Sequence, residues 1–327
     1  MKGCGIDVSK DTLDVVIRHA GKSLKVVTYD NTPAGHATLV KQLLKSRVTH
    51  VCLEATGNYH LDLAVALDAA KGIAVMVINP RAARHFAKAM MQQNKTDAID
   101  AELLAQFVER MEFVAWQAPD AERLALRTCS RWMVSQTKAL TKLKNQLHAF
   151  ESTQQTPDFI IEDVKQSINH LQVQIDKMVK QAVALIKQHE ALAAGYHLLV
   201  SIKGVAAKSA VKLLGELCIL PADMTAKQWV AHAALFPRII ESGKSVSKKP
   251  RIGLAGNRYV REALYMPALN AAHRDPNVSA FYQHLVNDNG LTKLQALCAV
   301  MRKLLVAIHA MLRTGKPFQS AWFYAVA

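Results

Sequence analysis

The apolar and polar positions of the first hundred residues alternate between a strand-like and a helix-like pattern. The strand-like segments are residues 4–8, 13–18, 23–29, 48–54 and 73–80, and the helix-like segments are residues 33–46 and 59–70. The order along the chain is therefore three strands, a helix, a strand, a helix, a strand and then helices. We expect a mixed sheet with helices packed on it, which is compatible with several folds, the ribonuclease-H-like fold among them.

The middle of the chain has the periodicity of two long helices. The first begins near residues 118–122 and repeats apolar residues at spacings of three and four as far as Phe150. A polar break at 151–158 precedes a heptad seam, whose members are Val164, Ile168, Leu171, Ile175, Met178, Ala182 and Leu185. The two helices predict a coiled-coil arm, formed either as an antiparallel hairpin within one chain or by pairing with another subunit.

The last segment begins L-L-V-S-I-K-G-V-A-A-K-S-A-V-K-L-L, residues 198–214. The pattern predicts a helix-hairpin-helix: a helix, a tight turn at Gly204 and a second helix that begins with Lys208. Such a motif presents backbone N–H groups that bind a phosphate without contacting a base. Together the three patterns divide the chain into domains at 1–117, 118–196 and 197–327.

Length and composition indicate how many domains to expect, and they argue against a membrane protein and a zinc site. A chain of 327 residues can bury a core in two or three domains. The apolar runs are shorter than a bilayer span and no N-terminal signal pattern is present, so we expect no membrane partner. The five cysteines are scattered without a C-x-x-C pair, which favours free thiols in the reducing cytoplasm and argues against a zinc site.

The positive charge is concentrated at the end of the chain. The formal net charge is +15, and residues 199–327 carry 17 Lys and Arg against six Asp and Glu. Residues 1–110 have a net charge of only +3, and residues 111–198 of +1. Because phosphate contacts release counterions, so basic a last third predicts a nucleic-acid partner.

Four acidic residues are candidates for a metal site. Asp7 and Glu54 each follow an apolar strand, while Asp97 and Asp100 lie at the start of a helix, where they share a face with roughly 5–6 Å between Cβ atoms. If the first and fourth strands are neighbours, all four carboxylates approach one another and need cations to neutralise them. Oxygen ligands without Cys or His suit Mg²⁺. The alternative is that Thr96 or Asp97 simply caps the helix.

A second candidate for a functional site is the basic stretch R-I-I-E-S-G-K-S-V-S-K-K-P-R, residues 238–251. Ser242 is either a nucleophile, with nearby arginines stabilising charge on a phosphate, or merely a contact to a DNA backbone. No histidine lies in the stretch, so a nucleophilic serine would need a lysine, a water or a metal-bound group as its base.

The combined motifs resemble a known family. They are G-I-D-V-S-K-D-T-L-D-V, C-L-E-A-T-G-N-Y, V-I-N-P-R, N-K-T-D-A-I-D-A-E-L-L-A, E-S-G-K-S-V and N-R-Y-V-R-E-A-L-Y-M-P-A-L. In this order they are similar to the DEDD-type bacterial insertion-sequence transposases, which include pilin-type DNA invertases and bridge-RNA-guided recombinases. The similarity extends from about residue 3 to residue 320.

The resemblance implies a fold that is α/β plus all-α: a RuvC-like mixed sheet, a coiled-coil arm and a mainly helical C-terminal transposase domain. It carries the family's four catalytic, metal-binding acids onto Asp7, Glu54, Asp97 and Asp100, and its serine nucleophile onto Ser242. It further implies Mg²⁺ (or Mn²⁺), a covalent phosphoserine–DNA intermediate, and a guide (bridge) RNA that pairs with donor and target DNA. The two sites are expected to meet across subunits of a homo-oligomer, a dimer that assembles to a tetramer.

We therefore predict a cytoplasmic, nucleoid-associated DNA recombinase. The residues expected to bind nucleic-acid phosphates are Gly204, Lys208, Arg238, Lys244, Lys248, Lys249, Arg251, Arg258 and Arg261. Two other classes stay open: a metal-only nuclease resembling a Holliday-junction resolvase, in which Ser242 only contacts DNA, and a non-catalytic nucleic-acid-binding module.

Overall fold

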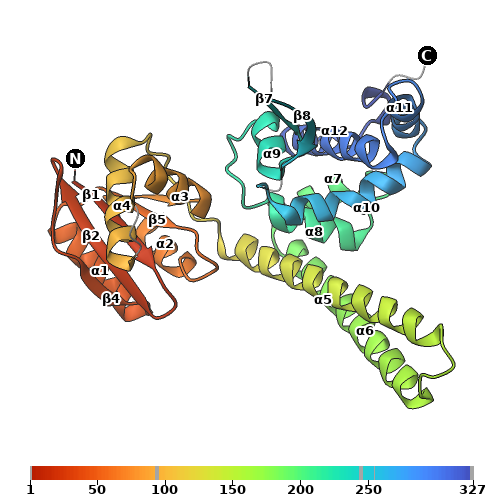
Figure 1. The fold of residues 1–327 in the computed structure, drawn as a ribbon, viewed down its shortest axis with the longest axis horizontal. Coiled ribbons are helices and arrows are strands. Elements are labelled where there is room, and N and C mark those ends of the chain that lie inside the picture. The colour runs from red at the N-terminus through yellow and green to blue at the C-terminus, as the bar shows by residue number, and fades with distance from the viewer. Residues whose placement is uncertain (1, 93–95, 243–245, 254, 325–327) are drawn as a thin grey trace. The chain divides into compact units, whose positions relative to one another are not determined.

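The computed structural model describes residues 2–92, 96–242, 246–253 and 255–324, and of Ser242 and residues 246–249 it describes the backbone. Two compact units divide the chain at residue 118 (Figure 1). The first is an α/β unit and the second is mainly helical.

The first unit is built on a six-stranded mixed sheet. Its strands are β1 (Lys2–Val8), β2 (Thr12–His19), β3 (Lys22–Ser23), β4 (Val27–Asp30), β5 (His50–Glu54) and β6 (Ala74–Ile78). The strand order is β3-β2-β1-β5-β6, with β1, β5 and β6 parallel and β2 antiparallel to β1. This is a RuvC-like, ribonuclease-H-like arrangement, so the predicted fold class is confirmed. The third expected strand is divided into β3 and β4, which both pair with β2.

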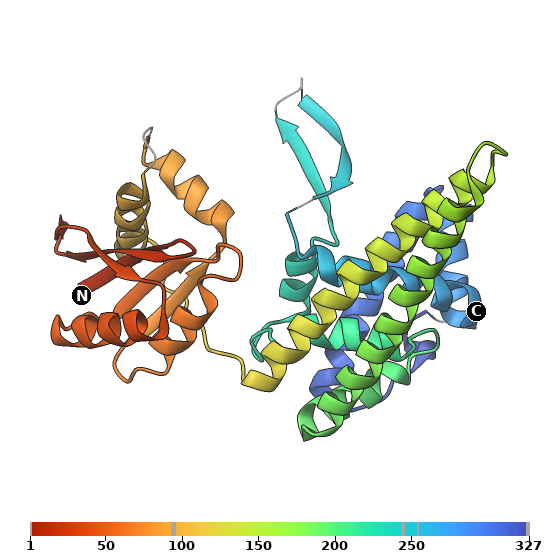
Figure 2. The ribbon, with the colours of Figure 1, turned by 90° about the horizontal axis from the view of Figure 1, so that it is seen from below.

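Helices cover both faces of this sheet (Figure 2). On one face, α1 (Pro33–Lys45) and α2 (Leu61–Asp68) share a core with the side chains of Ile6 and Leu53. On the other face, α3 (Pro80–Ala89) and α4 (Asp97–Arg110) pack against Cys52 and Met76. Because successive residues of a strand point to opposite faces, β5 and β6 each contribute to both cores.

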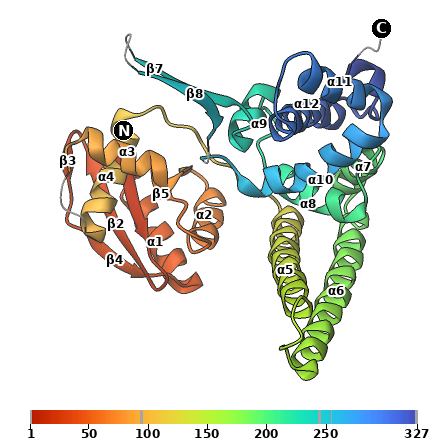
Figure 3. The same cartoon turned by 45° about the vertical axis from the view of Figure 1, so that its right-hand side comes forward.

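The predicted arm is formed by α5 (Ala121–Glu151) and α6 (Asp158–Lys187), which lie side by side (Figure 3). The connection at residues 152–157 lets α6 return along α5 as an antiparallel hairpin. Within the heptad seam, Val164, Ile175 and Ala182 are buried, and the other members are half-buried. The seam is therefore covered within one chain, as one of the two alternatives requires.

The remaining elements form a helical body. They are α7 (Glu190–Val200), α8 (Ala207–Leu217), α9 (Ala226–Ala233), the hairpin β7 (Pro237–Ser242) and β8 (Val246–Ile252), α10 (Arg258–Arg274), α11 (Pro276–Asn287), α12 (Lys293–Thr314) and the short η1 (Ser320–Trp322). Their core also contains Leu126 and Met133 of α5 and Ala182 and Ile186 of α6. The base of the arm and the C-terminal helices therefore share one core.

Among the described residues, one helix, α12, is long and apolar enough by length and composition to cross a membrane. The sequence had predicted no such segment, because Arg302 and Lys303 interrupt the apolar run without ending the helix. Val300, Leu304 and Ile308 of α12 are fully buried in the helical body. A buried core helix has the same length and composition, and these contacts show α12 in that role.

Candidate active site and nucleic-acid-binding residues

The end of β1 places Asp7 beneath the first turn of α4. Gly5 and Asp7 point to the same face of the sheet because they are two residues apart. A Cβ atom on Gly5 would lie 2.1 Å from the carbonyl oxygen of Ala101 and 2.2 Å from the amide nitrogen of Ala105. The missing side chain lets the backbone of α4 lie directly on β1, which brings the start of α4 close to Asp7.

Glu54 reaches the same edge from the neighbouring strand. Strands β1 and β5 are parallel and Ile6 pairs with Leu53, so Asp7 and Glu54 occupy the next position on each strand. The Thr56 hydroxyl donates a 3.0 Å hydrogen bond to Oε1 of Glu54. The predicted neighbourhood of the first and fourth strands is thus present.

The start of α4 resolves how the helix is capped. Thr96 is the N-cap: its backbone is extended, and its hydroxyl oxygen accepts a 3.3 Å hydrogen bond from the amide of Ile99. Asp97 and Asp100 occupy the first helical turn. The cap therefore does not use the Asp97 carboxylate, and of the two capping candidates Thr96 is the one observed.

The carboxyl group of Asp7 responds to its acidic neighbours. Burial, followed by the charges of Asp100, Asp97, Glu54 and Asp14, raises the pKa of Asp7 from 3.8 to about 6. The four predicted acids thus lie near one another, on the sheet face that α4 covers.

Asp14 also belongs to this group of acids, although it was not among the residues predicted from the sequence. It is the cross-strand partner of Asp7 on β2, and its Oδ1 accepts a 2.6 Å hydrogen bond from the Thr28 hydroxyl. The available signal was alternation: in residues 13–18, Asp14 occupies a position on the same face as Asp7 if the first two strands pair.

The donor set fits a hard divalent cation. Asp7, Glu54, Asp97 and Asp100 offer carboxylate oxygens, which Mg²⁺ and Mn²⁺ prefer. Their crowding leaves negative charge that a bound cation would neutralise, as the raised pKa of Asp7 indicates. Glu54 and Asp100 also line a cleft of about 280 Å³ between the sheet and helices α3 and α4.

Ser242 belongs to the second unit, at the end of β7. It is the last paired residue of that strand, opposite Val246 of β8. Nearer the base of the hairpin, Arg238 pairs with Arg251, and both are exposed. Like charges directly opposite each other on a sheet repel, and an anionic partner relieves that repulsion. Lys248 and Lys249 lie in β8, and Lys244 lies outside the described residues.

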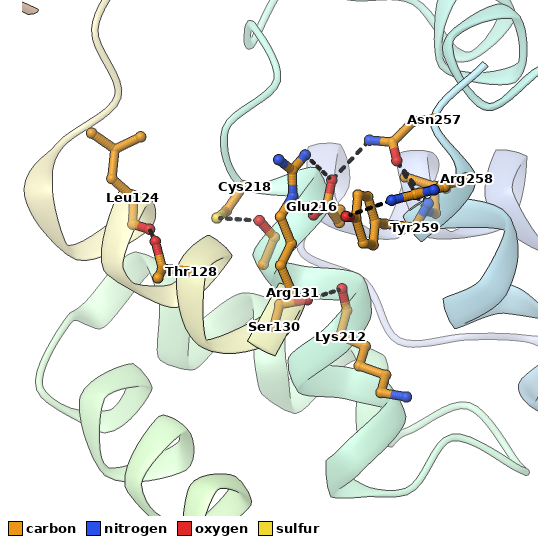
Figure 4. A network of polar contacts seen from close by, with 12 residues as sticks. Leu124, Thr128, Ser130, Arg131, Lys212, Glu216, Cys218, Asn257, Arg258 and Tyr259 are labelled. Atoms are coloured by element: carbon orange, nitrogen blue, oxygen red, sulfur yellow. Dashed lines mark hydrogen bonds and ion pairs between the residues drawn. The ribbon is translucent and has the colours of Figure 1, made fainter. Parts of the chain in front are cut away.

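A buried carboxylate ties together the elements from which the hairpin extends (Figure 4). Glu216 of α8 is fully buried and accepts hydrogen bonds from Nε and Nη2 of Arg131 on α5, at 2.7 and 3.2 Å. Its Oε2 also accepts a 2.8 Å bond from the Asn257 side chain. Asn257 caps α10, and its backbone N–H donates a 2.7 Å hydrogen bond to the backbone carbonyl of His232. Both ends of the hairpin are thereby held to the helical body.

Two family models match this chain. One describes DEDD transposases of the IS110 type and matches residues 4–150, and the other describes the transposase IS116/IS110/IS902 family and matches residues 196–283. The chain belongs to the IS110 family of DEDD transposases. The predicted family is confirmed, and the protein is an enzyme of DNA transposition.

Relatives of this IS110-family transposase match over nearly its whole length. It is 28% identical over 319 residues to the pilin gene-inverting protein of Moraxella bovis, with 96% of each chain covered. The pilin gene-inverting protein of Moraxella lacunata is 28% identical over 320 residues, again with 96% of each chain covered. Among solved structures, T. thermophilus RuvC in complex with a Holliday junction substrate is similar at 18% identity and a TM-score of 0.28, over 34% of this chain and 96% of that chain.

The other predicted phosphate contacts of the transposase differ in accessibility. Arg258 is exposed, with its guanidinium 5.0 Å from the ring centroid of Tyr259. Arg261 instead donates a 2.8 Å hydrogen bond from Nη1 to the carbonyl of Ala233, so this side chain has a structural partner at the end of α9.

The predicted helix-hairpin-helix is formed by α7, the turn at Gly204 and α8. Gly204 has a φ of +103°, and a Cβ atom there would lie 2.9 Å from Cβ of Asn270, so this turn packs against α10. Lys208 is half-buried in the first turn of α8. Burial lowers the pKa of Lys208, a shift that Asp176 opposes and Lys144 reinforces.

Proposed function

We propose that this transposase excises and inserts its own insertion-sequence element by RNA-guided strand exchange, acting on DNA at the bacterial nucleoid in the cytoplasm. Asp7, Glu54, Asp97 and Asp100 hold Mg²⁺ or Mn²⁺, and Ser242 is the nucleophile. A homo-oligomer, a dimer that assembles to a tetramer, brings the acids of one subunit to the serine of another.

The observation that carries this proposal is the convergence of four carboxylates at one edge of the sheet. Asp7 and Glu54 end parallel neighbouring strands, and α4 presents Asp97 and Asp100 above them. The raised pKa of Asp7 supports their close approach. A divalent cation held there would stabilise negative charge as a phosphodiester reacts.

The serine supplies the covalent chemistry in this scheme. The Ser242 oxygen attacks phosphorus, the bond from phosphorus to one DNA oxygen breaks, and a phosphoserine–DNA ester forms. The serine proton passes to a base, and the departing DNA oxygen takes up a proton. A hydroxyl of the exchanged strand then loses its proton to a base and attacks the ester, the bond from phosphorus to the serine oxygen breaks, and Ser242 regains a proton. The exposed Arg238 and Arg251 of the same hairpin support stabilisation of the phosphate charge.

RNA guidance and donor and target DNA binding are the remaining parts of the proposal. The net charge of residues 199–327, with 17 basic against six acidic side chains, supports a partner rich in phosphate. The family resemblance supports a structured non-coding RNA, which would recognise DNA by base pairing while the protein binds backbones.

Trapping a covalent adduct tests the proposal. Purified protein is incubated with element-end DNA, RNA transcribed from the element and Mg²⁺, and protein–DNA adducts are separated under denaturing conditions. We expect an adduct with the wild type, none with Ser242→Ala, and at least about a hundredfold slower formation with Asp7→Ala, because loss of one electrostatic stabiliser costs on this order. Ser247→Ala, on the second strand of the same hairpin, is the matched control and should retain the adduct.

The possible results separate the three function classes. An adduct that survives Ser242→Ala overturns the nucleophile assignment. Metal-dependent nicking with no adduct in the wild type points to a metal-only nuclease. Tight binding without cleavage under any condition points to a non-catalytic module. If the protein–DNA adduct forms equally well when the RNA is omitted, the proposal of RNA guidance is wrong.

A further inference from the structure

Helix α3 carries positive charge beside the acidic cleft. Its exposed residues Arg81, Arg84, His85 and Lys88 follow the three- and four-residue spacing of one helical stripe, and the helix has no acidic residue. Phe86 packs against the core on this face of the sheet. The apolar side of α3 therefore fixes the helix, and the basic side is presented to solvent.

Arg84 and Lys88 occupy a specific place on that stripe. They are one helical turn apart, and both line the cleft whose lining also includes Glu54 and Asp100. Within the part of the chain that the structure describes, neither side chain forms a hydrogen bond or an ion pair. Two cations thus lie on the same cleft as two of the acids without being neutralised by them.

The chemistry of a DNA substrate explains this separation. A phosphodiester approaching the acidic residues brings further phosphates on either side, and the carboxylates repel them all. A cation held by the acids would neutralise charge on the phosphate nearest to it, whereas the flanking phosphates need a separate source of positive charge. Unpaired guanidinium and ammonium groups one turn apart supply it, because such groups bind phosphate oxygens directly.

We infer that Arg84 and Lys88 bind the phosphates that flank the reacting one, and so fix the register of the DNA strand in the acidic cleft. This rests on the proposed function and adds to it the surface that holds the strand at the acidic site. The residues lie outside the basic C-terminal third, which accounts for most of the net positive charge of the chain.

A charge-matched pair of variants tests the inference. Arg84→Gln/Lys88→Gln removes two positive charges from α3. Lys41→Gln/Lys45→Gln removes the same charge at the same spacing from α1, on the opposite face of the sheet, where both lysines are exposed. Binding of full-length protein to element-end DNA is measured with Ca²⁺ in place of Mg²⁺, at salt concentrations from 50 to 200 mM.

The slope of log affinity against log salt reports the number of phosphates neutralised. We expect the slope of the α3 variant to be smaller in magnitude by about 1 to 2, since each duplex phosphate contact contributes about 0.9 to it. At 100 mM salt, this variant should bind at least about tenfold more weakly than the wild type. The α1 variant should match the wild type. Equal slopes for the α3 variant and the wild type overturn the inference, as does an equal loss in both variants.

Localised DNA cutting distinguishes this failure from failure of the proposed function. Fe²⁺ with ascorbate and peroxide generates radicals that cut DNA beside a bound metal. Localised cuts in the wild type that Asp7→Asn abolishes support a metal–DNA site at the acids, and their loss or displacement in the α3 variant supports the inference. Wild-type cuts that the α3 variant leaves unchanged overturn the inference alone, whereas no localised cuts in the wild type overturn the acidic site itself.

Discussion

Gly5 and Ala101 are in direct backbone contact: a Cβ atom on Gly5 would lie 2.1 Å from the Ala101 carbonyl oxygen. This contact sets how closely α4 approaches β1. Because Asp97 and Asp100 open α4 and Asp7 ends β1, it also sets the spacing of the acidic residues. One glycine therefore links the packing of the sheet to the geometry of the candidate metal site.

Substitution of that glycine should damage the fold and the site together. Gly5→Ala places a methyl group against backbone atoms that no rotamer change can move, so we expect a loss of at least about 2 kcal/mol in the free energy of unfolding. Mn²⁺ binding, measured by calorimetry, should weaken at least about tenfold. Gly21→Asn is the control, because no atom lies within 4 Å of a Cβ there and Asn tolerates its positive φ. Unchanged Mn²⁺ affinity in Gly5→Ala would contradict the proposed link.

The raised pKa of Asp7 predicts how the stability of the metal-free protein depends on pH. Between pH 3.8 and about 6, the folded protein keeps a proton that the unfolded chain releases. The free energy of unfolding therefore falls as pH rises through this window, and stays lower above it. Asp7→Asn has no carboxyl group to ionise at this position. Without metal, its melting temperature should therefore be higher than that of the wild type at pH 7.5, and the difference should be smaller at pH 4. An equal difference at both values would contradict this account.

The fully buried carboxylate of Glu216 should contribute more to stability than the half-buried carboxylate of Glu262, whose partner is exposed. Glu216→Gln removes the charge of a fully buried carboxylate that pairs with the half-buried Arg131, and we expect a cost of about 3 kcal/mol in urea unfolding of the second unit. Glu262 forms a 2.7 Å ion pair with Lys138, whose side chain is 54% exposed. Glu262→Gln should therefore cost less than about 1 kcal/mol. Similar costs for the two variants would show that burial does not govern these pairs.

The seam of the arm gives a fourth prediction. Ile175 is 1% exposed between α5 and α6, and Ile175→Ala should cost about 2–4 kcal/mol through lost burial and a residual cavity. Val173, two residues earlier, is 60% exposed, and Val173→Ala should change stability by less than about 0.5 kcal/mol. Thermal unfolding followed by circular dichroism at 222 nm measures both, and a large effect of Val173→Ala would indicate that the outer face of the arm is also covered.

Much of the fold could be predicted from local patterns in the sequence. The order of strands and helices and the heptad seam depend on spacings within ten or twenty residues, where backbone geometry dictates which side chains share a face. The start of α4 is equally local, since Thr96 bonds to an amide three residues on. Asp7 and Glu54 could be foreseen as neighbours because each ends an apolar strand, and only the strand order had to be supposed.

Only the tertiary structure decided which distant side chains share a site. Asp14 joins the acids because β2 pairs with β1 in one register. Arg84 reaches their cleft because α3 and α4 pack on the same face. Arg131 meets Glu216 across 85 residues of sequence because α5 and α8 share a core. None of these contacts has a local period, since each forms when whole elements bury their apolar faces and bring their polar residues together.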